Sequence, residues 1–453
     1  MGLKLLLVCA LALLMSIPAF FVFMLLSDRT HRAEQVTSEV SQLVGGEQTF
    51  LGPVLAISYV TPPAAKDQAA GAGVFIVFPA TGEATIGSSS SVRRRSLFKV
   101  PVYQADVAFH AHFDLKGAQA FAPRGAVIDW ARAEFIVGAT DPRGARADVL
   151  FKVGGQSRSV APSTILQSGT AGMPPDAARA VGALPDLGLK FFAASASGIS
   201  PSDAFDVDAT LKFSGAKRFA VLPFAKTTRL HVTGDWPSPS FDGGFLPDAR
   251  RIDARGFSAA WTVPFIARGV PAQGESEVIA RLQPSALGVS FVEPANPYQS
   301  VARSLKYALM FVGLVFLAYF LFETTQGKRV HPAQYVLIGL AQVVFYLMLL
   351  SIAERLGFDI AFLIAAGATV ALISAYAGWV FEARRQGVIA LAVFSLLYGL
   401  IYVLMRLEDL ALLVGALVSF AAIAVVMYVT RRLDWYGAPS STEPGSPTIK
   451  EPT

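Results

Sequence analysis

His110, His112 and Asp114 are the residues whose types and spacing best suit a chemical role. They occupy alternate positions of one extended run, and alternate residues of a β-strand point to the same face of its sheet. Two histidines placed in this way can share a zinc ion, with a carboxylate as a further ligand. The alternative is an ordinary solvated strand face, because no further histidine or cysteine lies near them in the sequence. We expect no resident metal and no cofactor, and keep these three residues as the candidate metal ligands.

Signatures of hydrolytic and phosphate-binding chemistry are missing from the sequence. It contains neither a G-x-S-x-G nucleophile elbow nor an H-E-x-x-H zinc motif. Its glycines have neither dinucleotide-binding nor P-loop spacing. These absences argue against catalysis, and we expect the protein not to be an enzyme.

The densest run of charge consists of Arg93, Arg94 and Arg95. Three adjacent cations can contact the anionic head groups of membrane lipids. They can equally form a solvated loop at the start of a strand. The chain carries a formal net charge of only +5, so a nucleic-acid partner is not expected.

A second charged group, formed by Arg406, Glu408 and Asp409, separates the last two apolar segments of the chain. Asp409 directly precedes the final segment, where a carboxylate can accept hydrogen bonds from the free N–H groups of a helix. Glu408 adds negative charge near the positive end of the same helix dipole. We expect a structural role, and the alternative is that these charges bind lipid or a partner.

Long apolar segments are the first kind of structural element that the sequence predicts, and they determine where the charged residues named above can lie. One lies at the N-terminus, and five follow in the last third of the chain, at residues 304–323, 334–351, 357–380, 387–405 and 410–430. Each of the five has roughly 18 to 24 positions, enough to cross about 30 Å of hydrocarbon. Hydrophobic residues make up 53% of the sequence and the mean hydropathy is +0.49, as is typical of membrane proteins. We predict six transmembrane helices: an anchor at residues 1–27 and a five-helix bundle at residues 304–432.

Basic residues between the segments predict the orientation, because short cytoplasmic loops retain lysine and arginine. Basic pairs fall at residues 328–329, 384–385 and 431–432, in the first, third and last junctions. The two remaining junctions carry one arginine each, balanced by acidic residues. Both termini are therefore expected inside. The first segment is interpreted as an uncleaved anchor, because its apolar run is longer than that of a signal peptide and no small-x-small site follows it.

The span between the anchor and the bundle, residues 28–303, must then lie outside. Cys9 is the only cysteine, so this span has no disulfide. Period-two alternation predicts β-strands at residues 52–60, 74–78, 97–113, 147–153, 209–213, 229–233, 257–263 and 288–292. We expect an all-β, antiparallel sandwich-like domain, with a possible division into two sub-domains near residues 154–175. Residues 29–44 have helical periodicity, and residues 433–453 are too polar to fold.

Several runs of the sequence resemble the CreD family of bacterial inner-membrane proteins. They are RVHPAQYVLIGLAQVVFYLMLLSIAERLGFDIAFLIAA, LLYGLIYVLMRLEDLALLVGALVSFAAIAVVMYVTRRLDWY and WPSPSFDGGFLPDAR. The run RSLFKVPVY is also similar, with Ser96 where glycine is expected. The resemblance implies a Gram-negative inner-membrane protein linked to cell-envelope integrity and two-component stress control. It implies neither an enzymatic activity nor a cofactor.

Two functions are compatible with these observations. The first is a non-enzymatic scaffold or sensor that presents a periplasmic β-domain. The second is a carrier or binder of lipid or another hydrophobic molecule, which would need a cavity in the bundle or a continuous apolar groove in the outer domain. The central parts of the apolar segments contain no ionisable group for coupled transport, so we favour the first. The expected partners are the lipid bilayer, anionic lipid and other envelope proteins.

Overall fold

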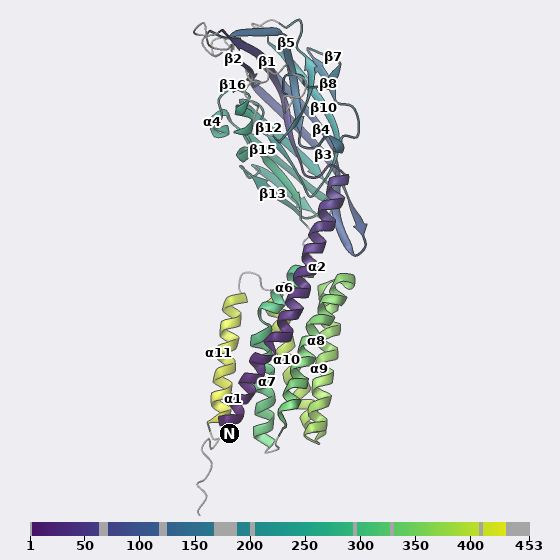
Figure 1. Ribbon diagram of the computed structural model, residues 1–453, viewed down its shortest axis with the longest axis vertical. Helices are drawn as coiled ribbons and strands as arrows, with labels where there is room; N and C mark the ends of the chain where they lie inside the picture. Colours follow the sequence, from purple (N-terminus) through teal and green to yellow (C-terminus); the bar gives the residue numbers. More distant parts are fainter. Residues whose placement is uncertain are drawn as a thin grey trace, which may run out of the picture. The chain divides into compact units, whose positions relative to one another are not determined.

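The chain forms two compact units in the computed structural model (Figure 1). The helical unit combines Met1–Arg32 with Ala295–Thr453, and the β unit comprises Ala33–Pro294. The residues that the structure describes are 2–62, 71–116, 125–166, 188–199, 204–292, 297–326, 330–406 and 411–431.

Apolar helices build the helical unit, as the hydropathy pattern predicts. They are α1 (Gly2–Leu14), α2 (Ser16–Leu43), α6 (Pro297–Lys306), α7 (Ala308–Gln326), α8 (Pro332–Leu356), α9 (Phe358–Val380), α10 (Arg384–Arg406) and α11 (Ala411–Thr430). Among the described residues, four helical stretches are long and apolar enough to cross a membrane: Leu6–Leu43, α8, α9 and α10. α6 and α7 meet at a bend of 53° and make a fifth if they count as one span, and α11 contributes the shorter apolar stretch Leu413–Val425.

Local sequence signals set the limits of α8. His331 precedes it, and its Nδ1 accepts a hydrogen bond from the N–H of Ala333 at 3.3 Å. Pro332 takes the first helical position, where its missing N–H costs nothing. Gly357, with a φ of 82°, ends α8 and allows the chain to reverse into α9.

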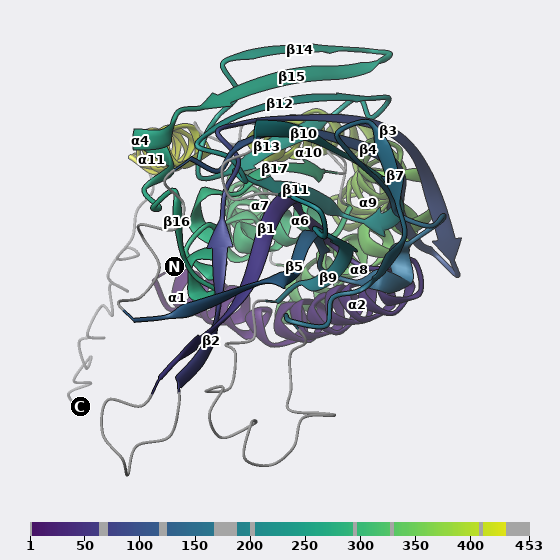
Figure 2. The same ribbon diagram turned by 90° about the horizontal axis from the view of Figure 1, so that it is seen from above.

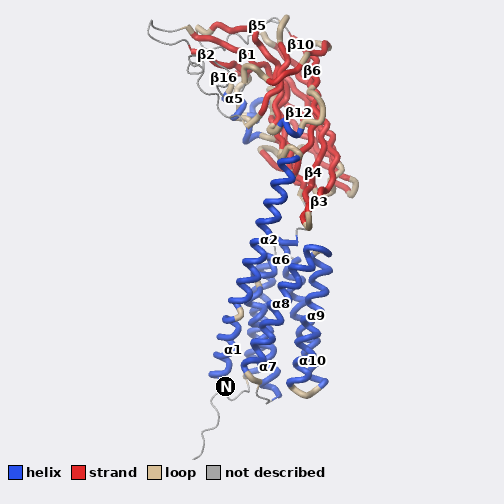
Figure 3. Tube along the Cα trace, turned by 45° about the vertical axis from the view of Figure 1, so that its right-hand side comes forward, coloured by secondary structure: helices blue, strands red, loops and turns tan. Residues whose placement is uncertain are grey.

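Two β-sheets form the β unit (Figures 2 and 3). Sheet 1 has the order β13-β17-β11-β1-β5-β9-β8, with β2 paired to β1 and β16 paired to β2. Its strands are β1 (Gln48–Thr61), β2 (Gly71–Val77), β5 (Val127–Ala139), β8 (Val160–Pro162), β9 (Lys190–Ser195), β11 (Arg218–Leu222), β13 (Pro239–Gly243), β16 (Gln273–Glu275) and β17 (Leu287–Phe291).

Sheet 2 has the order β14-β15-β12-β3-β4-β10-β6-β7. Its strands are β3 (Thr81–Arg95), β4 (Phe98–Asp114), β6 (Leu150–Val153), β7 (Gln156–Arg158), β10 (Ala204–Ala216), β12 (Thr227–Gly234), β14 (Ala249–Asp253) and β15 (Gly256–Val263). β7 belongs to sheet 2 and β8 to sheet 1, so the chain crosses between the sheets within residues 156–162, where the sequence suggested a division into sub-domains.

The inner faces of the two sheets share one buried core. The ring centroids of Phe113 in β4 and Phe135 in β5 lie 5.4 Å apart, and those of Phe50 in β1 and Phe213 in β10 lie 5.5 Å apart. Both pairs join sheet 2 to sheet 1 by edge-to-face contacts, which favour close packing of aromatic side chains. The arrangement is therefore a β-sandwich.

Most strand pairs are antiparallel, as the sequence predicts, but two are parallel. β1 pairs with β11, and β12 pairs with β3, in parallel registers. The prediction of a purely antiparallel sandwich is wrong at these two places. Alternation of apolar residues identifies a strand and its buried face, but it does not identify the neighbour of that strand.

Strand alternation decides which side chains of sheet 2 face solvent. In β4, Val107, Phe109 and Ala111 are buried, whereas Asp106 and His110 are exposed. The β3–β4 hairpin turns at Ser96, whose φ of 58° lies in the left-handed region that favours glycine.

Candidate functional site

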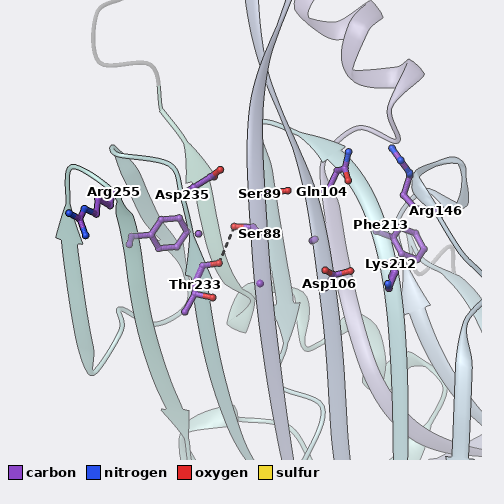
Figure 4. A pocket seen from close by; sticks show the side chains of 14 residues that line it. Ser88, Ser89, Gln104, Asp106, Arg146, Lys212, Phe213, Thr233, Asp235 and Arg255 are labelled. Atoms are coloured by element: carbon purple, nitrogen blue, oxygen red, sulfur yellow. Dashed lines mark hydrogen bonds between the residues drawn. The ribbon is translucent and has the colours of Figure 1, made fainter.

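A polar groove of about 700 Å³ lies on the solvent face of sheet 2 (Figure 4). Its central row crosses four neighbouring strands. Lys212 of β10 pairs with Asp106 of β4, Asp106 pairs with Gly87 of β3, and Gly87 pairs with Thr233 of β12. The register of the sheet therefore brings together residues that are far apart in the sequence.

Gly87 contributes to the depth of this groove. A Cβ atom added to Gly87 would meet no heavy atom within 4 Å. Gly82, in the same strand but on the buried face, differs, since its Cβ would lie 2.5 Å from the ring of Phe224. The missing side chain at Gly87 thus leaves open space on the solvent face and is not needed for packing of the core.

Hydrogen bonds fix one wall of the groove. The N–H and hydroxyl groups of Ser90 donate to Asp235 Oδ1 at 2.8 and 2.6 Å. The hydroxyl of Ser88 donates to the carbonyl of Thr233 at 3.1 Å. The Asp235 carboxylate is therefore held in place by β3, and Figure 4 shows it on the same side of the groove as Ser88.

Three cations, Arg146, Lys212 and Arg255, also line the groove. All three are exposed, and among the described residues none of them forms an ion pair within 4 Å. Charged groups without a partner in the protein are available to a ligand. Together with Asp106 and the hydroxyl and amide side chains of the lining, they suit a polar ligand that carries hydroxyl groups and negative charge.

Serine and threonine hydroxyls line the groove, and its described lining contains no histidine and no cysteine. The Ser88 hydroxyl donates to a main-chain carbonyl, and the Ser90 hydroxyl donates to the Asp235 carboxylate. Both hydroxyls are therefore engaged in hydrogen bonds within sheet 2.

The structure gives His110 and His112 carboxylate partners on the next strand of the same face. His110 Nδ1 lies 2.8 Å from Asp208 Oδ1, and His112 Nδ1 lies 2.8 Å from Asp206 Oδ1. Asp114 does not join them, because its carboxylate accepts a hydrogen bond from the N–H of Lys116 at 3.1 Å. Within the described ranges, no group of three or more potential ligands is placed to hold a metal ion.

His110 belongs to a row of alternating charge across sheet 2. Asp208 pairs with Lys152 on one side and with His110 on the other, and His110 pairs in turn with Glu83, which faces Arg229. The hydrogen bond with Asp208 raises the pKa of His110, while partial burial opposes this shift. Protonated His110 is therefore favoured between its two acidic neighbours.

Arg93, Arg94 and Arg95 lie at the end of β3, next to the hairpin turn, and all three are exposed. Arg95 donates a hydrogen bond from Nη1 to Glu39 Oε2 at 2.5 Å. Glu39 lies in the last turns of α2, where the neighbouring Val40 packs against Val100 of β4. The structure thus gives Arg95 a local role as well as an exposed surface.

In the helical unit, Arg406 forms an ion pair with Asp359, which accepts a hydrogen bond from the Tyr402 hydroxyl at 3.0 Å. Glu408 and Asp409 lie outside the described residues. An apolar groove of about 670 Å³ runs between α9 and α10, and Asp359 and Tyr402 belong to its lining. This groove belongs to the helical unit, where a lipid carrier would need a cavity.

Glu323 is a buried ionisable group that the sequence reasoning missed. It is 5% exposed, pairs with Lys4, and accepts hydrogen bonds from the N–H of Val330 at 2.9 Å and the hydroxyl of Tyr335 at 2.8 Å. It lies at the end of an apolar segment, a position typical of a solvated boundary residue. The only sequence signal for a buried ion pair was a glutamate in the last turn of an otherwise apolar helix. Its partner Lys4 lies more than 300 residues away in the sequence.

The chain matches the family model of inner membrane protein CreD over residues 1–436, so the match spans both units. The inner membrane protein CreD of Escherichia coli (strain K12) is 28% identical over 433 residues, which cover 94% of this chain and 91% of that protein.

Proposed function

Because this chain belongs to the CreD family of inner membrane proteins, we propose that it is a non-enzymatic protein that supports cell-envelope integrity or the response to envelope stress. The helical unit anchors it in the membrane, and the β unit is a periplasmic scaffold or sensor. The groove of sheet 2 is the observation that carries this proposal. It offers exposed cations that form no ion pair among the described residues, together with hydroxyl and amide groups, as expected of a binding surface.

Photocrosslinking in cells tests this role. A photoreactive residue at Gln104, in the groove, should capture an envelope component, whereas one at Thr262, exposed on β15 of the same sheet, should not. Lys212→Glu should abolish the crosslink and fail to complement an envelope defect. Lys152→Glu, which reverses an exposed lysine on neighbouring β6, should leave both intact. Equal crosslinking at Gln104 in the two charge variants would refute the groove as the binding surface.

The proposal includes a topology of six spans with both termini in the cytoplasm. The four long apolar stretches and the bent pair α6 and α7 support five of these spans, and the sixth is assigned to α11, whose apolar stretch Leu413–Val425 is shorter. The basic pairs of the loops support the orientation. Alkaline phosphatase fusions after residues 150 and 357 should be active, and those after residues 329, 385 and 436 inactive. An active fusion after residue 385 would refute this topology.

The apolar groove between α9 and α10 favours a second function, a carrier or binder of lipid. Gly367 and Gly399 line it, and a Cβ at either position would meet no heavy atom within 4 Å. Gly399→Leu should therefore fill the groove without disturbing the helices. If the protein carries lipid, this variant should lose co-purifying lipid in native mass spectrometry and fail to complement. Unchanged lipid and full complementation would exclude this function.

A further inference from the structure

Buried polar groups without a partner are concentrated inside the helical unit. Among the described residues, the hydroxyls of Tyr319, Tyr346 and Ser374 and both amide atoms of Gln342 are fully buried and form no hydrogen bond. They come from α7, α8 and α9. Buried polar groups are normally paired with protein or with ordered water, so several unpartnered groups in one helical unit point to a bound partner.

These groups are spread along the helices. Tyr335, Gln342 and Tyr346 follow one another in α8 at intervals of seven and four residues, which places them on one face over about 16 Å. Tyr398 and Tyr402 have the same four-residue spacing in α10. The polar groups therefore occur at successive levels of the helical unit.

An ion pair lies at each end of this series. Near the start of α8, the Tyr335 hydroxyl donates to buried Glu323 at 2.8 Å, and Glu323 pairs with Lys4. Beyond the end of α8, the Tyr402 hydroxyl donates to Asp359 at 3.0 Å, and Asp359 pairs with an arginine. The unpartnered groups lie in helices that connect these two ends.

We propose that the helical unit binds a file of ordered water molecules between these two ion pairs. Hydroxyl and amide groups are uncharged and can both donate and accept, which matches water better than an ion. A buried water typically makes about three hydrogen bonds, so a few water molecules can satisfy the unpartnered hydroxyl and amide groups. Purely apolar cavities, by contrast, stay dry. The water gives Glu323 a hydrogen-bonded path into the interior of the helical unit, which is a functional arrangement for a carboxylate in a membrane.

Radiolytic footprinting of the full-length protein in lipid nanodiscs tests the proposal, because hydroxyl radicals produced from bound water oxidise the side chains beside it. Tyr346 and Phe394 form a matched pair, since they are 1% and 0% exposed and both have oxidisable aromatic rings, and the ring of Phe394 contacts that of Phe322. We expect Tyr346 to be oxidised at least fivefold faster than Phe394. Equally slow oxidation of the two rings would show that the site is dry.

Gln342→Leu supplies an independent test. With bound water, the variant should reduce oxidation of Tyr346 at least threefold, whereas Val343→Leu at the adjacent buried apolar position should not. If the site is dry, Gln342→Leu removes two unpaired atoms, so the melting temperature should rise while oxidation stays the same, and this result would overturn the proposal. If Gln342→Leu does not fold, the comparison of Tyr346 with Phe394 in the natural protein still decides.

Discussion

Replacing Gly87 by valine should block ligand binding in the groove of sheet 2 without lowering the stability of the β unit. The position lies inside strand β3 on the solvent face, and the space above it is empty. Valine can therefore occupy the floor of the groove without displacing any neighbour. Because its branched side chain also suits a strand, the variant should fold at least as well as the natural protein.

The expected gain in stability is about 1 kcal/mol. Glycine inside a strand costs roughly 0.5–1 kcal/mol relative to alanine, and strand preferences span about 1 kcal/mol. Gly82→Ala is the matched control, because its Cβ would lie 2.5 Å from the Phe224 ring and 2.8 Å from Ala225 Cβ. Overpacking of this kind costs about 1–3 kcal/mol, so the two variants should change stability in opposite directions.

Chemical unfolding followed by tryptophan fluorescence measures both changes, since Trp261 is buried in the β unit at 2% exposure. Gly87→Val should unfold at the same or a higher denaturant concentration, yet lose the crosslink at Gln104 and fail to complement. Gly82→Ala should unfold earlier, and retain the crosslink under conditions where it stays folded. If Gly87→Val is less stable than Gly82→Ala, or complements fully, the reasoning about the groove is wrong.

Three further predictions concern charged groups. Glu323→Ala should lower the stability of the helical unit by about 3–5 kcal/mol, because three donors lose their buried acceptor. Thermal unfolding in detergent measures this loss, and an unchanged melting temperature would contradict the prediction. The pair of His110 and Asp208 should contribute less than about 1 kcal/mol, since both side chains are half exposed. This contribution should be present at pH 5 and lost as the pH rises through the raised pKa of His110. If the free energies of unfolding of His110→Gln and the natural protein differ by the same amount at every pH, the prediction is wrong. Replacing Arg93, Arg94 and Arg95 with glutamine should weaken salt-sensitive binding to anionic liposomes, and equal binding would identify a solvated surface.

The sequence predicts much of the fold because hydropathy and alternation are local signals. The prediction of a strand at residues 97–113 corresponds to β4 (Phe98–Asp114), and the helical periodicity of residues 29–44 lies within α2 (Ser16–Leu43) except for its last residue. The expected apolar segment at residues 357–380 corresponds to α9 (Phe358–Val380). In each case, the pattern of buried positions within the element carries the information.

The candidate sites depend on strand register, which the sequence does not reveal. Asp106 meets Lys212 only because β4 lies beside β10, and the same pairing gives His110 its partner Asp208. The spacing of the histidines suggested that they share a ligand with each other, whereas the structure pairs each with a carboxylate from another strand. Glu323 was missed for a similar reason, because its partner Lys4 belongs to the opposite end of the chain.

The position of β1 has a consequence for how the β unit acquires its structure. β1 is the first strand of the chain, and β5 pairs with one of its edges. On the other edge, Leu55–Thr61 pair with β2, which follows directly, whereas Gln48–Leu51 pair with the distant β11. Contacts between residues so distant along the chain form slowly, since the entropy of closing a long loop is lost before any pairing compensates for it. During synthesis from the N-terminus, residues Gln48–Leu51 of β1 therefore keep one edge unpaired until β11 has emerged. Nascent chains of this protein should accordingly be prone to aggregation through that edge, and chaperones that cover extended strands should have a large effect on its yield.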